Sequence, residues 1–181
     1  LNVSRIEDGR FGYRFNKANI VETITSIVTN SAISAREHGI NVNFDVPAQP
    51  IPPFVFDQEK ISLALQNITD NAIKYTPSGG SVTISIVVEE KFVKISIHDT
   101  GVGVPKNQIG RLFSKFFRAE NVMHMQTSGS GLGLFIVKNI IARHGGEISV
   151  ESEENKGSTF WFTLPTDENL IPSRDEKVAY Y

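Results

Sequence analysis

The chain has 181 residues, of which 40% are hydrophobic, and its 18 basic and 20 acidic residues give a net charge of -2. This length and composition predict one globular domain with short flanks. The near-neutral charge argues against a nucleic-acid backbone or an anionic membrane as a partner. The lack of cysteine excludes disulfides and thiolate metal sites, and no apolar run approaches the roughly 20 residues that span a bilayer.

Residues 1–15 mix charged residues, glycine and aromatic side chains without a clear period, which is typical of a linker that leads into a domain. A helix is then expected from Asn19, whose side chain can cap its N-terminus, to Gly39, which can end it. Alternating apolar residues predict a strand over 40–46, and a short extended piece is expected at 54–56.

Asp57 can cap a second helix, which runs to about Tyr75. At about 100° per residue its apolar side chains form one stripe, while Asn67, Asn71 and Lys74 form a second stripe beside it. This helix is therefore expected to bury one face and to present amide and ammonium groups on another.

Residues 81–88 and 92–99 alternate apolar and polar side chains and predict a hairpin that ends at Asp99. A short helix is expected after Pro105. The irregular polar stretch at 120–130 is interpreted as a lid over a binding site.

A third long helix is predicted at 131–144, followed by strands at 147–151 and 158–164. Strand pairs beside helices, without regular β-α-β alternation, favour an α+β fold. The expected architecture is a two-layer α/β sandwich in which about three helices cover one face of a mixed sheet. The domain is expected to span 16–165, with a charged, structureless tail at 166–181.

The polar stripe on the second helix has the chemistry of a metal and phosphate site. The amide oxygen of Asn71 is a hard ligand that suits a Mg²⁺ ion already bound to phosphate oxygens and water. Asn67 lies one turn earlier, Lys74 adds a cation for a polyphosphate, and Tyr75 could pack against a base or ribose. On an isolated helix the same residues would more often form a solvated surface, so the later segments decide between the two interpretations.

Asp99 ends a strand just before Gly101 and Gly103, where the backbone can approach a ligand closely. A carboxylate accepts a hydrogen bond from an exocyclic amino group, which adenine carries at the position where guanine has a carbonyl oxygen. This segment therefore favours ATP over GTP.

Gly129, Gly131 and Gly133 lead into a helix, so free amides and the positive end of the helix dipole would face a phosphate. Their spacing is neither that of the P-loop nor that of a dinucleotide fingerprint. Arg118, at the edge of the lid, is a candidate for contact with a γ-phosphate. Three nearby side chains are expected to seat the base of the lid in the core: Phe113, Phe116 and Phe117.

Taken in order, these segments resemble the N, G1, F and G2 boxes in the catalytic and ATP-binding domain of bacterial sensor histidine kinases. That domain belongs to a superfamily shared with gyrase, heat-shock chaperone and MutL ATPases. The resemblance covers roughly residues 16–165 and implies the Bergerat ATP-binding fold, while residues 1–11 resemble the end of a second dimerisation helix. The segments are Asn67–Tyr75, Asp99–Gly103, Phe113–Phe117 and Gly129–Leu134, and Gly157–Thr159 resembles the closing G3 element.

The resemblance implies a role for each segment. Asn71 would bind Mg²⁺, Asp99 would bind the adenine amino group, and the lid would close over the triphosphate of ATP. Phosphoryl transfer would involve Asn67, Asn71, Lys74 and Arg118. The residues expected to bind the nucleotide are Asn71, Lys74, Tyr75, Asp99, Gly101, Gly103, Val104, Gly129, Ser130, Gly131, Leu132, Gly133, Leu134 and Thr159.

In the related ATPases a glutamate that activates water stands four residues before the metal-binding asparagine, and in this chain that position is Asn67. Without a carboxylate base, ATP hydrolysis should be slow. The acceptor histidine of the family lies on a helix and is followed by an acidic residue, a context that none of the histidines of this chain has. The chain is therefore expected to bind ATP without phosphorylating itself. Its histidines are His38, His98, His124 and His144.

The resemblance also implies partners, namely a histidine-bearing dimerisation domain of the same parent protein and a cognate response regulator. The fragment is expected to be a cytoplasmic monomer that does not insert into a membrane. Because the chain begins at Leu1 rather than Met, it is interpreted as a piece of a homodimeric parent that could carry a membrane anchor. Two alternatives stay open: a nucleotide-binding regulatory module without transferase activity, and a water-using ATPase of the gyrase type, which Asn67 disfavours.

Overall fold

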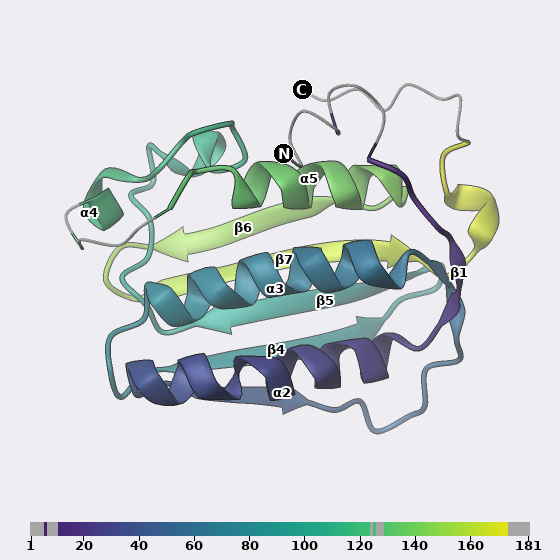
Figure 1. Ribbon diagram of the computed structural model, residues 1–181, viewed down its shortest axis with the longest axis horizontal. Coiled ribbons are helices and arrows are strands. Elements are labelled where there is room, and N and C mark those ends of the chain that lie inside the picture. The colour runs from purple at the N-terminus through teal and green to yellow at the C-terminus, as the bar shows by residue number, and fades with distance from the viewer. Residues whose placement is uncertain (1–5, 7–10, 124, 126–128, 174–181) are drawn as a thin grey trace.

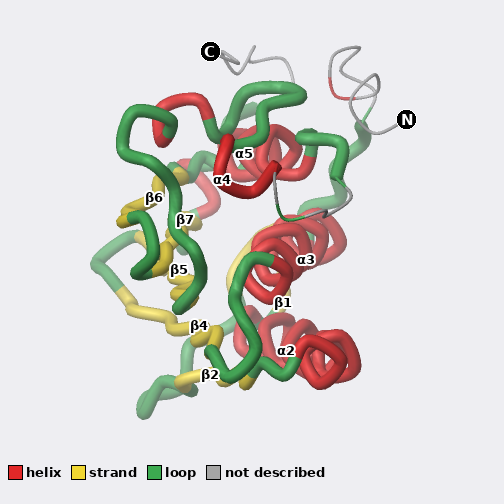
Figure 2. The backbone as a smooth tube through the Cα atoms, turned by 90° about the vertical axis from the view of Figure 1, so that its left-hand side faces the viewer, coloured by secondary structure: helices red, strands yellow, loops and turns green. Residues whose placement is uncertain are grey.

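The computed structural model describes residues 6, 11–123, 125 and 129–173. Three long helices, α2 (Ile20–His38), α3 (Gln58–Lys74) and α5 (Gly133–Arg143), lie on one face of a five-stranded sheet (Figure 1). Figure 2 shows the two layers from the side, with the five-stranded sheet in one layer and the three long helices in the other. The predicted α+β sandwich, with three helices on one face, is confirmed.

The main sheet has the strand order β2-β4-β5-β7-β6. Strands β2 and β4 are parallel and the other pairs are antiparallel, so the sheet is mixed, as expected. A separate small sheet pairs β1 with β3, antiparallel. The bounds are β1 (Asn16–Ala18), β2 (Asn41–Asp45), β3 (Phe54–Phe56), β4 (Ser81–Val88), β5 (Phe92–Asp99), β6 (Ile148–Glu153) and β7 (Gly157–Pro165).

Local capping chemistry sets the helix ends where the sequence predicts them. The side chain of Asn19 accepts hydrogen bonds from the backbone amides of Val21 and Glu22, and Asp57 accepts one from the amide of Lys60. Gly39 ends α2 in the left-handed conformation, with φ +68°. These signals act over three or four residues, so they can be identified without knowledge of the fold.

The structure departs from the expected elements in three places. Strand β1 is too short to give a pattern of its own. The segment after Pro105 forms only a 3₁₀ turn, η1 (Ile109–Arg111), and the predicted lid begins with a short helix, α4 (Glu120–Met123). Residues 124 and 126–128 of that lid lie outside the described residues.

The flanks also differ from expectation. Residues 11–15, predicted as linker, pack against the ends of α3 and α5 through aromatic side chains. Residues 166–173, predicted as structureless, contain a 3₁₀ turn, η2 (Glu168–Leu170), and the carbonyl of Pro172 accepts a hydrogen bond from Arg143. The rest of both predicted flanks, apart from residue 6, lies outside the described residues.

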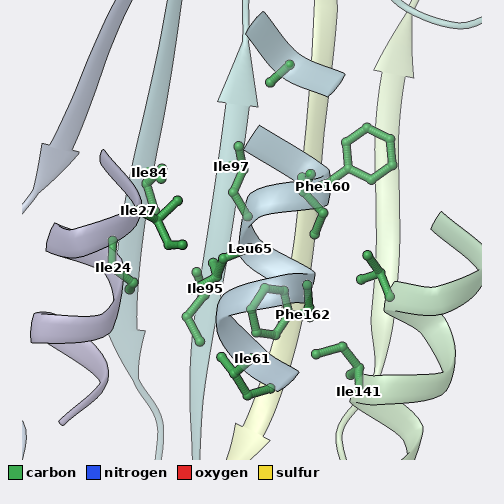
Figure 3. Packing of buried hydrophobic residues seen from close by; sticks show 14 of the residues in the cluster. Ile24, Ile27, Ile61, Leu65, Ile84, Ile95, Ile97, Ile141, Phe160 and Phe162 are labelled. Carbon is green, nitrogen blue, oxygen red and sulfur yellow. The ribbon is translucent and has the colours of Figure 1, made fainter. Parts of the chain in front are cut away.

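Helix α3 lies between α2 and α5 and packs against both (Figure 1). Its residues Ile61 and Leu65 meet Ile95, Ile97 and Phe162 of the central strands in a fully buried cluster (Figure 3). Burying each such side chain contributes roughly 1.5–3 kcal/mol. This packing fixes the polar face of α3 relative to the end of β5. Among the described residues, no helix is long and apolar enough to cross a membrane.

Candidate functional site

A cavity of about 320 Å³ opens beside the C-terminal half of α3, between the end of β5 and the start of α5. Figure 1 shows this end of the molecule beside α4. The lining residues come from all four segments singled out in the sequence. They are Asn67, Asp70, Asn71, Ala72, Lys74, Tyr75, Asp99, Gly103, Val104, Leu112, Phe117, Arg118, Ala119, Val122, Gly129, Ser130, Gly131, Gly133, Leu134, Ser158 and Phe160.

The polar stripe of α3 faces the cavity because its apolar stripe is buried against the sheet. The side-chain amide of Asn67 donates a hydrogen bond to the carbonyl of Leu63, 2.8 Å away, which leaves the Oδ1 atom of Asn67 on the side of α5. A Cβ atom on Gly133, the first residue of α5, would lie 2.8 Å from that oxygen. The two helices are therefore in close contact at the cavity, and only glycine fits there without displacing Asn67.

The glycine-rich segment passes close to two other parts of the site. A Cβ atom on Gly129 would lie 3.3 Å from the ammonium nitrogen of Lys74. Gly131 has φ +68°, and a Cβ atom there would lie 2.6 Å from the carbonyl carbon of Phe116. This backbone therefore forms a cradle next to an ammonium group, at the N-terminus of a helix, which suits a phosphate group.

Asp99 lies buried at the other end of the cavity, with 5% of its surface exposed. Its Oδ1 atom accepts hydrogen bonds from the amides of Gly101 (2.8 Å) and Ser158 (3.2 Å). Burial raises the pKa of Asp99, and these two hydrogen bonds oppose the rise. Among the described residues both bonds end on Oδ1, so Oδ2 is available to accept a hydrogen bond from a ligand.

Three predicted nucleotide residues do not line the cavity. Gly101 instead donates its amide to Asp99, and a Cβ atom there would lie 2.6 Å from the carboxylate. Leu132 lies between the cavity-lining Gly131 and Gly133, but its own atoms do not border the cavity.

The alternation of β7 places Thr159 outside the cavity. Thr159 is paired with His98, and its hydroxyl lies 2.9 Å from Nδ1 of His98, an exposed residue on the outer face of the sheet. Ser158, one residue earlier, is paired with Asp99 and lines the cavity. Successive strand residues point to opposite faces, so the two cannot share one site.

The three phenylalanines behave differently from one another. Phe113 is partly buried and packs edge-on against Phe160, with ring centroids 6.4 Å apart, as a residue that seats the lid should. Phe117 lines the cavity, next to Arg118. Phe116 contradicts the prediction, since 71% of its surface is exposed and its φ is +61°. Its backbone, and not its ring, is the part of Phe116 that lies against Gly131.

The sequence reasoning missed the apolar wall of the cavity and one carboxylate. The missed lining residues are Asp70, Ala72, Leu112, Ala119, Val122, Ser158 and Phe160. Alternation along the last strand places Ser158 and Phe160 on the same face as Phe162 and Leu164, but only the register with β5 brings Ser158 opposite Asp99. Asp70 is exposed and accepts a hydrogen bond from Gln66 at 2.6 Å.

The donor set fits magnesium bound together with a nucleotide. Within the described part of the chain, no three His, Cys, Asp or Glu residues are grouped so that they could hold a metal. An amide oxygen of Asn71 beside a phosphate cradle suits Mg²⁺, which takes most of its ligands from phosphates and water.

A two-layer sandwich with a buried carboxylate at one end of a cavity, and amide, ammonium and glycine groups at the other, defines a nucleotide-binding domain. Residues 56–168 match the family of histidine kinase-, DNA gyrase B- and HSP90-like ATPases. The chain belongs to this family.

Similar proteins narrow the likeness to sensor histidine kinases. The chain is 37% identical over 168 residues to sensor histidine kinase WalK of Bacillus subtilis, covering 91% of this chain and 27% of WalK. It is 43% identical over 131 residues to adaptive-response sensory kinase SasA of Rippkaea orientalis, covering 72% of this chain and 33% of that protein. The chain thus spans about a quarter to a third of the length of these curated relatives.

Solved structures agree with this assignment. The catalytic domain of histidine kinase ThkA, in a nucleotide-free form, superposes with a TM-score of 0.74 at 27% identity, covering 87% of this chain and 99% of that one. Full-length ShkA in complex with AMPPNP gives a TM-score of 0.77 at 28% identity, covering 91% of this chain and 34% of ShkA. The fold is that of the catalytic domains of histidine kinases.

Proposed function

We propose that the chain is the ATP-binding catalytic domain of a two-component sensor histidine kinase. In this function it transfers the γ-phosphoryl group of Mg-ATP to a histidine on a separate dimerisation domain. The observation that carries the proposal is one cavity that brings Asn67, Asn71 and Lys74 together with the glycine-rich segment, while Asp99 lies buried at its other end. The full-length ShkA structure, which holds AMPPNP, supports the choice of an adenine nucleotide.

Asp99 would select the base. Its Oδ1 atom is held by two backbone amides, so the carboxylate is fixed before a ligand arrives. Oδ2 would accept a hydrogen bond from the amino group of adenine. Guanine has a carbonyl oxygen at that position, which cannot donate such a bond. The apolar wall, which includes Leu112, Val122 and Phe160, would exclude water from the faces of the base.

The other end of the cavity would hold the triphosphate. Asn71 would supply one ligand to Mg²⁺, which neutralises charge on the phosphate oxygens. Lys74 and Arg118 line the same cavity and would attract the phosphate groups, while the amides near Gly129 and Gly131 would donate hydrogen bonds to them. In the reaction an imidazole nitrogen of the acceptor forms a bond to the γ-phosphorus as the bond to ADP breaks. The contribution of these residues is positioning and charge neutralisation.

Water is a poor nucleophile in this site. The amide of Asn67 is engaged with Leu63 and cannot accept a proton from water, as a carboxylate could. The cavity carboxylates are Asp70, which is bonded to Gln66, and Asp99 at the base end. We therefore infer slow hydrolysis, which preserves ATP for transfer and disfavours a gyrase-type ATPase.

The partners follow from the same proposal. A histidine-bearing dimerisation domain of the parent would present the acceptor at the mouth of the cavity, and a cognate response regulator would receive the phosphoryl group from it. The described histidines do not line the cavity, which supports an acceptor outside this domain. We place the domain in the cytoplasm, as a monomer by itself and as part of a homodimeric parent.

The test adds the dimerisation domain of the parent in trans to the purified chain, with γ-labelled ATP and Mg²⁺. Label on the acceptor histidine supports the kinase, and substituting that histidine should abolish it. ATP binding without transfer would favour the regulatory module, and stable label on the chain alone would contradict the expectation that it lacks an acceptor. Rapid release of phosphate without the added domain would favour the water-using ATPase.

A further inference from the structure

The two helices that carry the phosphate end of the cavity are in contact at both of their ends. At the cavity, Oδ1 of Asn67 on α3 lies against Gly133, where α5 begins. At the far end, α3 begins after Asp57 and α5 ends at Arg143, just before His144. Figure 1 shows both far ends on the same side of the molecule, near β1, and opposite to α4.

A buried histidine links the far ends. The backbone amide of Asp57 donates a hydrogen bond to Nε2 of His144 at 3.0 Å, and Nδ1 of His144 lies 2.7 Å from the carbonyl of Ile140. A backbone amide only donates and a carbonyl only accepts, so the imidazole is neutral with its proton on Nδ1. Only 1% of the surface of His144 is exposed.

Residues 11–15, which we call the aromatic segment, cover this histidine. Its alternate side chains point toward the helix ends. The rings of Tyr13 and Phe15 meet His144 edge-on, with centroids 5.9 and 4.9 Å apart, and the ammonium of Lys60 on α3 lies 4.3 Å from the ring centre of Phe11.

Asp57 joins the aromatic segment to the start of α3. Its Oδ2 atom accepts a hydrogen bond from the amide of Arg14 at 2.6 Å, and its Oδ1 atom caps the helix by accepting from the amide of Lys60 at 3.0 Å. The amide of Asp57 is the group that bonds to His144. One residue therefore receives contacts from the aromatic segment, from α3 and from the end of α5.

We propose that His144 is a positioning residue for nucleotide binding. Together with the docked aromatic segment it would fix the far ends of α3 and α5, and thereby the relative position of Asn67 and Gly133 in the cavity. This inference rests on the proposed function, because it requires a nucleotide in that cavity.

Transmission between the two ends needs only rigid helices. Helix α3 has 17 residues, which corresponds to a length of about 25 Å. Its buried face is close-packed, so it moves as a unit and does not absorb a displacement by bending. At the cavity a side-chain oxygen already fills the space that a Cβ of Gly133 would need, so a small slide of one helix along the other changes the phosphate cradle.

The experiment measures the dissociation constant of Mg-ADP by titration calorimetry on the full 181-residue chain and its variants. In His144→Phe an aromatic ring remains but both hydrogen bonds are lost. Tyr13→Ala combined with Phe15→Ala releases the aromatic segment and leaves His144 in place. Both variants are expected to bind Mg-ADP about tenfold more weakly, because a misplaced cradle loses its aligned contacts.

Phe44→Ala is the control for a general loss of stability. Phe44 is partly buried on β2, a strand that pairs with β4 and not with the strands at the cavity. This variant should lower the melting temperature and leave the affinity for Mg-ADP unchanged. A weakening in Phe44→Ala equal to that in His144→Phe would show that lost stability alone explains the effect, and would overturn the proposal.

Hydrogen exchange separates the two possibilities, because a residue that only stabilises the fold would not change its amide exchange rate when nucleotide binds. Coupling is reciprocal, so saturating Mg-ADP should slow exchange of the Arg14 and Asp57 amides in the wild-type chain by about the same factor of ten. Unchanged exchange on binding, or a folded double variant with wild-type affinity, would overturn the proposal. If His144→Phe fails to fold, the affinity of the double variant for Mg-ADP tests the proposal instead. Failure of the wild-type chain to bind any nucleotide would instead refute the proposed function.

Discussion

The carboxylate of Asp99 accepts a hydrogen bond from the backbone amide of Ser158, which lies 59 residues further along the chain. The antiparallel pairing of β5 with β7 brings the two residues opposite each other. A second amide, from Gly101, reaches the same oxygen atom. The carboxylate is thus held by main-chain amides from the turn after β5 and from β7, and its orientation does not depend on another side chain.

Asp99→Asn is expected to weaken binding of ATP and ADP by about 10- to 100-fold, because a hydrogen bond to a charged group is worth about 1.5–3 kcal/mol. The variant should fold. An asparagine oxygen can still accept from Gly101 and Ser158, and burial raises the pKa of Asp99, so its charge opposes folding. Titration calorimetry and thermal unfolding measure the two effects separately. Equal affinity in variant and wild type would remove Asp99 from the site.

Asn71→Ala is expected to abolish the part of nucleotide affinity that depends on Mg²⁺. The amide oxygen of Asn71 is expected to bind the metal and not the nucleotide. In EDTA, where no Mg²⁺ is present, its loss should therefore leave the binding of ADP nearly unchanged. Calorimetry with and without Mg²⁺ measures the difference. Asn43→Ala, an exposed asparagine on β2, is the matched control. A loss of affinity of equal size in EDTA would mean that Asn71 contacts the nucleotide directly and does not act through the metal.

Gly133→Ala should weaken nucleotide binding by about tenfold without reducing stability. A Cβ atom there would lie 2.8 Å from Oδ1 of Asn67, which must move toward the cavity or away from Leu63. Alanine in a helix is favoured over glycine by about 1 kcal/mol, which offsets the strain. Gly110→Ala is the control, because no atom lies within 4 Å of its Cβ position. Similar affinities in the two variants would contradict a cradle at the start of α5.

The sequence was sufficient to predict those structural features whose physical signal is local. The caps at Asn19 and Asp57, the hairpin of β4 and β5 and the two stripes of α3 each depend on residues within a few positions of one another. Asn67, Asn71 and Lys74 of the polar stripe on α3 all line the cavity, while their roles in binding and transfer stay predictions.

The failures depend on pairing between distant segments. The choice between Ser158 and Thr159 is a question of register against β5, and one residue of slip moves a side chain to the other face of the sheet. The aromatic residues Phe11, Tyr13 and Phe15 give no clear period in the sequence of the flank. The surface that they cover is formed by the start of α3 and by His144, which lies well over a hundred residues further along the chain. Nothing local identifies that partner.

Thr159→Val tests the position of Thr159 on the outer face of the sheet. The Thr159 hydroxyl contacts the exposed His98 on the outer face of the sheet, so its loss should leave the affinity for Mg-ADP within about twofold of wild type and change stability by about 0.5 kcal/mol or less. Calorimetry and urea unfolding report the two quantities. A large loss of affinity would restore Thr159 to the nucleotide site and contradict the observed pairing.

The stability of the domain should depend on pH through His144. Burial lowers the pKa of His144 to about 4 from the ordinary 6.5, with the nearby charge of Arg143 acting in the same direction. The hydrogen bond to Ile140 and the charge of Asp57 partly oppose this shift. Between these two pKa values the unfolded chain binds the proton and the folded chain does not. The stabilisation is therefore complete above pH 6.5 and is lost progressively as the pH falls toward 4.

Urea unfolding at pH 8 and pH 5 measures this loss, which should be about 2 kcal/mol larger for the wild-type chain than for His144→Phe. Comparing the two chains cancels the contributions of the other titrating groups to the pH dependence. One of these groups is Asp99, whose raised pKa adds stability as the pH falls. A wild-type chain with the same pH dependence as the variant would show that His144 is accessible to protons in the folded state. The neutral tautomer that links Asp57 to Ile140 would then be wrong, since a protonated Nε2 cannot accept the amide of Asp57.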